Sequence, residues 1–291
     1  MMKPQNHRRR RNRRVWAIVI LALALAMESA EGTICRSKPA YTGDWNDIST
    51  WADGVVPVDT DDVMITNAGS MVVLAFASSN LNSLLVGSTL LFTNWNSILR
   101  AREVTVASNG LLTLPGPFSN SIPSNNIYIV CTNLVVMNTG QIYADGKGYA
   151  GGNTSLGPGG YGPGGSAAST YHGASHGGIG GGDTAQAATP KAPYGEANAP
   201  LVPGSGGGWW NGPTSHGGGA IRIEAVGTVT VYGVISANAI NNGDNQWGGG
   251  SGGSVWIRCS RIMGTGLVAA NGGYGKGIGG NGGGGRVAID F

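Results

Sequence analysis

A sequence motif that occurs three times constrains the fold of this chain more than any other feature. GGGAIRIEA at residues 217–225, GGSVWIRCS at 252–260 and GGGRVAIDF at 283–291 follow one another at spacings of 35 and 31 residues. Such spacings are typical of proteins that stack similar units into a solenoid. IYIVCTN at residues 127–133 supplies an earlier copy, so four units can be aligned.

Apolar residues alternate with other residues inside each copy, which predicts strands that bury one face. The first aligned position holds Ile127, Ile221, Val255 and Val287. A second set of short apolar segments follows, at Ile142, Ile235 and Val268. Each ends at a residue type that tolerates turn geometry, so we expect a ladder of turns at Asp145, Asn238 and Asn271.

Stacking these strands in parallel would bury a continuous apolar column that one unit alone cannot form. We therefore predict an all-β chain folded as a right-handed parallel β-helix. A β-sandwich is the alternative, because short strands separated by glycine turns also suit it. Cys131 and Cys259 fall at the same position of the repeat, two units apart. They are then beyond the ~7 Å that a disulfide spans, so we predict two buried free thiols.

Residues 1–30 are predicted to be a secretory signal peptide. Lys3 and six arginines between Arg8 and Arg14 precede an apolar run over residues 15–27. The run is shorter than the ~20 residues of a bilayer span, and an uncleaved signal anchor is the alternative. These residues hold seven of the 18 basic and one of the 15 acidic side chains, so the remainder carries a net charge of about −3 rather than +3. No basic patch is left to favour nucleic acid as a partner.

The segment DWNDISTWADGVVPVDTDDVMI at residues 44–65 resembles the start of a G8 domain. The matching residues are Trp45, Trp51, Gly54, Pro57, Asp61, Asp62, Val63 and Ile65, followed by LNSLLV and GSTLLF. The resemblance covers residues 43–114 and implies a β module of large extracellular proteins, some of which bind or degrade hyaluronan. From the residues alone, Trp45 and Trp51 are expected to cover the open end of the first unit.

Residues 145–219 include 25 glycines among 75 residues without a three-residue period, which excludes collagen. A flexible loop and a packed bundle of extended glycine segments are both open interpretations. From here to Phe291 the chain resembles glycine-rich repeats of large secreted or cell-surface proteins. The predicted organisation is a signal peptide at 1–30, a G8-like cap with the first coils at 31–114, and a glycine-rich β-helix at 115–291 with an insertion at 145–219.

Three residues are weak candidates for catalysis: Glu224, Arg222 and His172. Glu224 and Arg222 belong to an outward-facing set with Arg258 and Asp290, which would suit a polysaccharide. The alternative is that Arg222 with Glu224, and Arg258 with Asp290, are surface ion pairs worth under ~1 kcal/mol each. His172 and His176 are four residues apart, but an intervening glycine disfavours the helix that would join them at a metal. The acidic turn at Asp59, Asp61 and Asp62 fits no defined calcium loop. We predict neither a metal site nor a cofactor.

Aromatic residues of the glycine-rich segments are better candidates for ligand binding: Trp209, Trp210, Trp247 and Tyr171. A ring that faces solvent can stack on a sugar or anchor a protein. For Trp209 and Trp210 the alternative is packing against the strands. The last strand has no polar unit after it, so we also expect self-association through an uncapped C-terminal end.

Taken together, these features favour a secreted or cell-surface structural or adhesive protein without enzymatic activity. The alternative is a carbohydrate-active β-helix that binds or cleaves an acidic polysaccharide such as hyaluronan, as the G8 resemblance implies. The expected partner is a polysaccharide or an extracellular protein.

Overall fold

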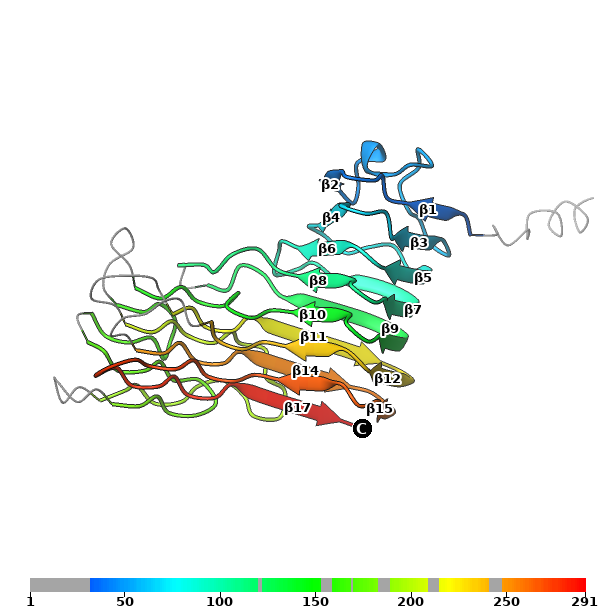
Figure 1. Ribbon diagram of the computed structural model, residues 1–291. Coiled ribbons are helices and arrows are strands. Elements are labelled where there is room, and N and C mark those ends of the chain that lie inside the picture. The colour runs from blue at the N-terminus through cyan, green and yellow to red at the C-terminus, as the bar shows by residue number, and fades with distance from the viewer. Residues whose placement is uncertain are drawn as a thin grey trace, which may run out of the picture.

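The computed structural model describes residues 32–119, 122–152, 159–168, 170–182, 189–208, 215–240 and 248–291. The predicted signal peptide and three predicted ligand-binding residues, Trp209, Trp210 and Trp247, lie outside this part. The described chain is all-β except for one short 3-10 helix, η1 (Ile48–Thr50). Its strands form two parallel sheets, called here the long sheet and the short sheet (Figure 1).

The long sheet contains, in spatial order, β1 (Ile34–Arg36), β3 (Asp62–Ile65), β5 (Leu81–Val86), β7 (Leu99–Val106), β9 (Ile127–Val136), β11 (Ala220–Ala225), β14 (Ser254–Arg258) and β17 (Arg286–Asp290). Beside the last residues of β9 it is extended by β12 (Thr228–Val231) and β15 (Arg261–Met263). The short sheet contains β2 (Thr42–Asp44), β4 (Met71–Leu74), β6 (Thr89–Phe92), β8 (Leu111–Thr113), β10 (Gln141–Tyr143), β13 (Val234–Ser236) and β16 (Leu267–Ala269).

The chain alternates between the two sheets. From β1 to β10, odd-numbered strands lie in the long sheet and even-numbered strands in the short sheet. We call a long-sheet strand together with the short-sheet strand that follows it a rung. All pairs of described strands are parallel, whereas a β-sandwich would pair its strands antiparallel. No helix in the described ranges is long and apolar enough to cross a membrane.

The predicted register of the strands is confirmed. The four aligned apolar residues pair in sequence across β9, β11, β14 and β17: Ile127, Ile221, Val255 and Val287. In the short sheet, Ile142 pairs with Ile235, and Ile235 pairs with Val268. Five of these side chains belong to one apolar core between the sheets, and Val268 packs against it: Ile127, Ile221, Val255, Ile142 and Ile235. Burial of a large aliphatic side chain stabilises a fold by ~1.5–3 kcal/mol. Val287, on the last strand, is 44% exposed. Cys131 and Cys259 are buried free thiols in this core, as predicted.

The predicted ladder of turns is also present, at the point where the chain leaves the short sheet. The backbone N–H of Asn238 donates to Oδ1 of Asp145 over 2.7 Å. One rung later, the backbone N–H of Asn271 donates to Oδ1 of Asn238, again over 2.7 Å. Each side chain thus accepts a bond from the backbone of the next rung, which fixes the rungs in register at this corner.

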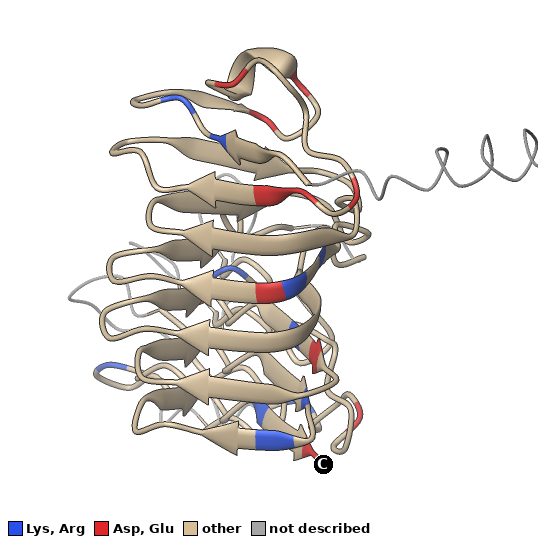
Figure 2. Cartoon of the chain, turned by 90° about the vertical axis from the view of Figure 1, so that its right-hand side faces the viewer, with Lys and Arg blue, Asp and Glu red and all other residues tan. Residues whose placement is uncertain are grey.

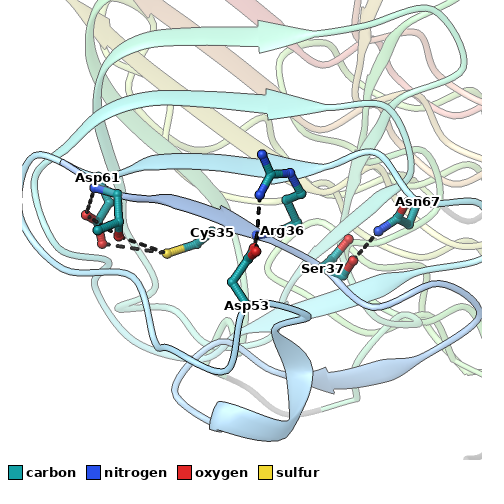
Figure 3. A network of polar contacts seen from close by, with 7 residues as sticks. Cys35, Arg36, Ser37, Asp53, Asp61 and Asn67 are labelled. Atoms are coloured by element: carbon teal, nitrogen blue, oxygen red, sulfur yellow. Dashed lines mark hydrogen bonds and ion pairs between the residues drawn. The ribbon is translucent and has the colours of Figure 1, made fainter.

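The first rung is covered by residues 45–54, called here the cap. Trp45 and Trp51 are buried, with ring centroids 5.3 Å apart in an edge-to-face arrangement, and the indole N–H of Trp51 donates to the Trp45 carbonyl. The free edge of β1 is covered as well. The Arg36 carbonyl accepts from the Ala52 N–H, and the Asp53 carboxylate accepts from the backbone and the guanidinium of Arg36 (Figure 3). Covering an edge in this way prevents it from pairing with another chain.

Extended segments that lie beyond the ends of the strands form a third layer, seen at the left of Figure 1. This glycine layer comprises residues 144–152, 160–165, 171–182, 202–208, 215–219, 248–253 and 270–285. Backbone hydrogen bonds link segments that are distant in sequence. For example, the N–H of Gly148 donates to the carbonyl of Gly217, that of Gly218 to Ser251, and that of Gly252 to Gly283. The described parts of the glycine-rich region are therefore packed, and the flexible-loop interpretation does not apply to them.

Glycine is needed in this layer because the main chains approach one another closely. A Cβ atom added at Gly207 would lie 1.9 Å from the Gly248 carbonyl oxygen, and one added at Gly253 would lie 1.9 Å from that of Gly219. Real Cβ atoms do not come so near to oxygen, so any side chain at these positions would separate the segments. Most of these glycines do not have a positive φ, so glycine is required here by the close approach of neighbouring main chains rather than by backbone conformation.

Candidate functional site

The outer face of the long sheet holds one arginine between two aromatic rings. Tyr128 on β9, Arg222 on β11 and Trp256 on β14 are direct neighbours in register. The Cζ atom of Arg222 lies 4.1 Å from the centroid of the Tyr128 ring and 5.0 Å from that of the Trp256 ring. Both distances are within the ~6 Å over which a cation is attracted to a ring face. The alternating strand pattern places all three side chains outward, because Ile221 and Ile223 on either side of Arg222 are in the core.

Glu224 holds this stack together, and the structure brings two of the predicted catalytic candidates into contact. Its carboxylate accepts from Nε of Arg222 over 2.6 Å and from the Tyr128 hydroxyl over 3.1 Å. Burial raises the pKa of Tyr128; the nearby Arg222 opposes this shift and Glu224 adds to it. The phenol therefore stays protonated and keeps donating to Glu224. The predicted ion pair between Arg222 and Glu224 is present, within one strand.

The second predicted ion pair, between Arg258 and Asp290, is not formed. These residues are direct neighbours on β14 and β17, but Asp290 accepts from the indole N–H of Trp256 over 2.8 Å. The indole N–H of Trp256 thus takes the place that was predicted for the guanidinium of Arg258. Arg258 is exposed and, within the described ranges, its side chain has no ion-pair or hydrogen-bond partner.

Arg258 and Glu224 border an open groove beside the stack. It is also lined by Val130, Ala225, Val226, Cys259, Ser260 and Phe291. A free guanidinium next to flat rings and an apolar groove suits a ligand that carries a carboxylate or sulfate on a ring-shaped body. Tyr128 and Trp256 were missed as candidate binding residues in the sequence, because aromatic residues were sought only in the glycine-rich segments. Their register beside Arg222 was the available signal.

His172, the third catalytic candidate, lies apart from Arg222 and Glu224. It is buried in the glycine layer, where the backbone N–H of Ala167 donates to its Nε2 over 3.2 Å. Tyr171 is also buried, so the expectation that its ring faces solvent is not met. Main-chain packing encloses it: the Gly280 N–H donates to the Tyr171 carbonyl. A catalytic role for His172 and a ligand-binding role for Tyr171 stay predictions.

His176 is the most deeply buried titratable group of the glycine layer. Its Nδ1 lies 2.7 Å from the Gly252 carbonyl, so Nδ1 carries the proton, and Nε2 has no hydrogen-bond partner among the described residues. The ring lies 4.6 Å from that of Tyr194, whose carbonyl accepts from the guanidinium of Arg286. Burial, assisted by the positive charge of Arg286, lowers the pKa of His176 to about 4.

This shift predicts that the glycine layer loses stability in acid. The pKa of an unfolded histidine is about 6.5, so below that pH the unfolded chain binds a proton that the folded chain refuses until about pH 4. Between these values His176 lowers the free energy of unfolding by about 3 kcal/mol in total. Denaturant titrations at pH 7 and pH 4.5 measure this loss. His176→Asn, which keeps a donor but does not titrate, should reduce it; an unchanged pH profile would contradict the prediction.

The acidic turn before β3 serves to fix the strands. Asp61 is buried and accepts from the backbone N–H groups of Thr33 and Val58 and from the thiol of Cys35 (Figure 3). Burial alone would raise the pKa of Asp61, but these donors outweigh it and hold the pKa below its usual range. In the described ranges no three His, Cys, Asp or Glu side chains are grouped as a metal would require.

Comparison with known proteins identifies one region of the chain. No curated protein and no solved structure is significantly similar to it. The family model of the G8 domain matches residues 50–133. The match begins inside the cap and runs into β9, further along the chain than the region 43–114 expected from the sequence. Residues 50–133, which build the first rungs and carry Tyr128 of the aromatic stack, are therefore similar to G8 domains.

Proposed function

We propose that this chain is a secreted or cell-surface scaffold with a structural or adhesive role and no enzymatic activity. Its finer architecture is a right-handed parallel β-helix: a G8-like cap and first coils at 31–114, then a glycine-rich β-helix at 115–291. G8 domains are typical of extracellular proteins, which supports this location. A signal peptide at 1–30 would deliver the chain there.

One observation carries the proposal: the polar groups best suited to chemistry are used to hold the fold. Glu224 accepts from Arg222 and Tyr128, and Asp61 ties β1 to the turn before β3. His172 and His176 are hydrogen-bonded to main-chain groups. Charged residues are sparse along the stacked strands (Figure 2). A surface of this kind supports attachment through shape and a few anchor residues rather than proton transfer.

The test is incubation of the secreted chain with hyaluronan, pectate and alginate, with the length of each polysaccharide measured before and after. A scaffold leaves all chain lengths unchanged. Shortened polysaccharide would contradict the proposal, and loss of that activity in Glu224→Gln would then assign an enzyme to the outer face of the long sheet.

The second candidate function is non-catalytic binding of an acidic polysaccharide, and the free cation of Arg258 beside the Trp256 ring favours it. We expect retention on hyaluronan that falls with salt, since exposed charges are screened. Arg258→Gln should weaken retention about tenfold, the loss of one charge-assisted contact. Arg261→Gln, another exposed arginine on the same sheet, is the matched control. Equal losses in both variants would indicate attraction without a site and would contradict this function.

A further inference from the structure

A second groove lies on the cap, at the opposite end of the strand stack from Arg258. It is lined by residues 44–48, by Val56, and by Val73, Ala75 and Phe76. It encloses about 570 Å³, within the range of ligand sites in proteins. Its apolar lining includes two side chains that are largely exposed, Phe76 at 64% and Ile48 at 59%. Exposed apolar side chains that share a concave surface are typical of interaction sites.

The walls of this groove are held by the fold. Phe76 precedes Ala77, which pairs with Ile98, and the Phe76 carbonyl accepts from the Ile98 N–H. Asp44 pairs with Val73 between β2 and β4. Asp47 is fixed at the start of η1, where its carboxylate accepts from the Ser49 N–H. A site that is rigid before binding loses less conformational entropy when its ligand arrives.

The charged side chains that line the groove are acidic. Asp44 and Asp47 are both exposed, and no lysine or arginine of the described residues lines the groove. The bonds from Ser49 lower the pKa of Asp47, so its carboxylate stays ionised at neutral pH. Two negative charges beside an apolar surface attract a partner that is positive and apolar, and they repel an acidic polysaccharide. The aliphatic side chains of Ile48, Val56 and Val73 match protein side chains better than the flat face of a sugar.

We propose that this groove docks a protein segment in which apolar residues alternate with lysine or arginine. Phe76 and Ile48 would receive the apolar side chains, and Asp44 with Asp47 would receive the cations. The inference deepens the adhesive role proposed above by naming a class of partner. The groove on the cap shares no lining residue with the groove at Arg258, so an experiment can contradict one proposal without contradicting the other.

The probes are a short peptide of alternating lysine and leucine and its counterpart with glutamate for lysine, titrated into the full chain by calorimetry. The lysine peptide should bind, more weakly at high salt, and the glutamate peptide should not. Phe76→Ser should weaken binding about tenfold, through loss of one buried apolar contact. Asp44→Asn should weaken it several-fold and reduce the salt dependence.

Both positions are exposed, so these variants should unfold at the same temperature as the unmodified chain. Ile122→Ser is the matched control, because Ile122 is 76% exposed and does not line the groove. The proposal would be overturned by equal binding of the two peptides, or by equal losses in Phe76→Ser and Ile122→Ser. Competition by neutral oligosaccharides that depends on Phe76 would also overturn it, since the occupant would then be a sugar.

Discussion

Trp51→Ala is expected to lower the free energy of unfolding by about 3–5 kcal/mol, the usual cost of removing a large buried aromatic side chain. Trp51 is fully buried, packs edge-to-face on Trp45 and donates its indole N–H to the Trp45 carbonyl. Removing it leaves a cavity over the first rung and an unsatisfied carbonyl. Denaturant unfolding followed by circular dichroism measures the loss.

The variant should also self-associate, because the cap that Trp51 anchors covers the edge of β1 through Ala52 and Asp53. Ile48→Ala is the control from the same cap. Ile48 is 59% exposed, so its truncation should change stability by less than about 0.5 kcal/mol. A cost below about 1 kcal/mol for Trp51→Ala, with no change in sedimentation, would show that the two tryptophans do not hold the cap.

The second large effect on stability is expected in the glycine layer. Among three consecutive glycines, substitution of the first or the third by alanine should destabilise the fold, whereas substitution of the middle one should not. A Cβ at Gly283 would lie 2.1 Å from the Gly178 carbonyl oxygen, and one at Gly285 would lie 2.1 Å from that of Gly253. Nothing lies within 4 Å of a Cβ at Gly284. Gly283→Ala and Gly285→Ala should each cost at least about 3 kcal/mol, since the backbone must move to admit the methyl group.

Gly284→Ala is the matched control and should be neutral or stabilise the chain by up to about 1 kcal/mol, through the lower entropy of the unfolded state. Thermal unfolding of the three variants compares them directly. Equal stabilities would mean that the segments do not approach one another as closely as the hydrogen bonds require, and that glycine has another purpose here.

The strands could be predicted from the sequence because their contacts are made by side chains that repeat. Ile127, Ile221 and Val255 occupy one column since stacked rungs bury equivalent residues, and the repeat shows which residues are equivalent. The turns at Asp145 and Asn238 could be predicted for a related reason: their side chains satisfy local backbone groups.

The glycine layer and the details of the outer face could not be predicted in the same way. In the glycine layer, backbone contacts backbone, and glycine leaves no side-chain pattern that would reveal which segments meet. The burial of Tyr171 follows from that packing and was missed with it. On the outer face, the alignment of the repeats does not show whether Trp256 or Arg258 donates to Asp290. The choice of Trp256 over Arg258 depends on the reach of two side chains, and only the three-dimensional structure gives it.

Hydrogen exchange tests most directly the central claim, that the glycine segments form an ordered third layer beyond the ends of the strands. The N–H groups of Gly148, Gly178, Gly204, Gly218 and Gly252 each donate to a carbonyl of another segment. Mass spectrometry of the exchanging full chain should find peptides that contain these residues protected, with rates that approach those of β9 and β11. Exchange of these peptides at the rate of an unstructured chain, while β9 and β11 remain protected, would contradict the account.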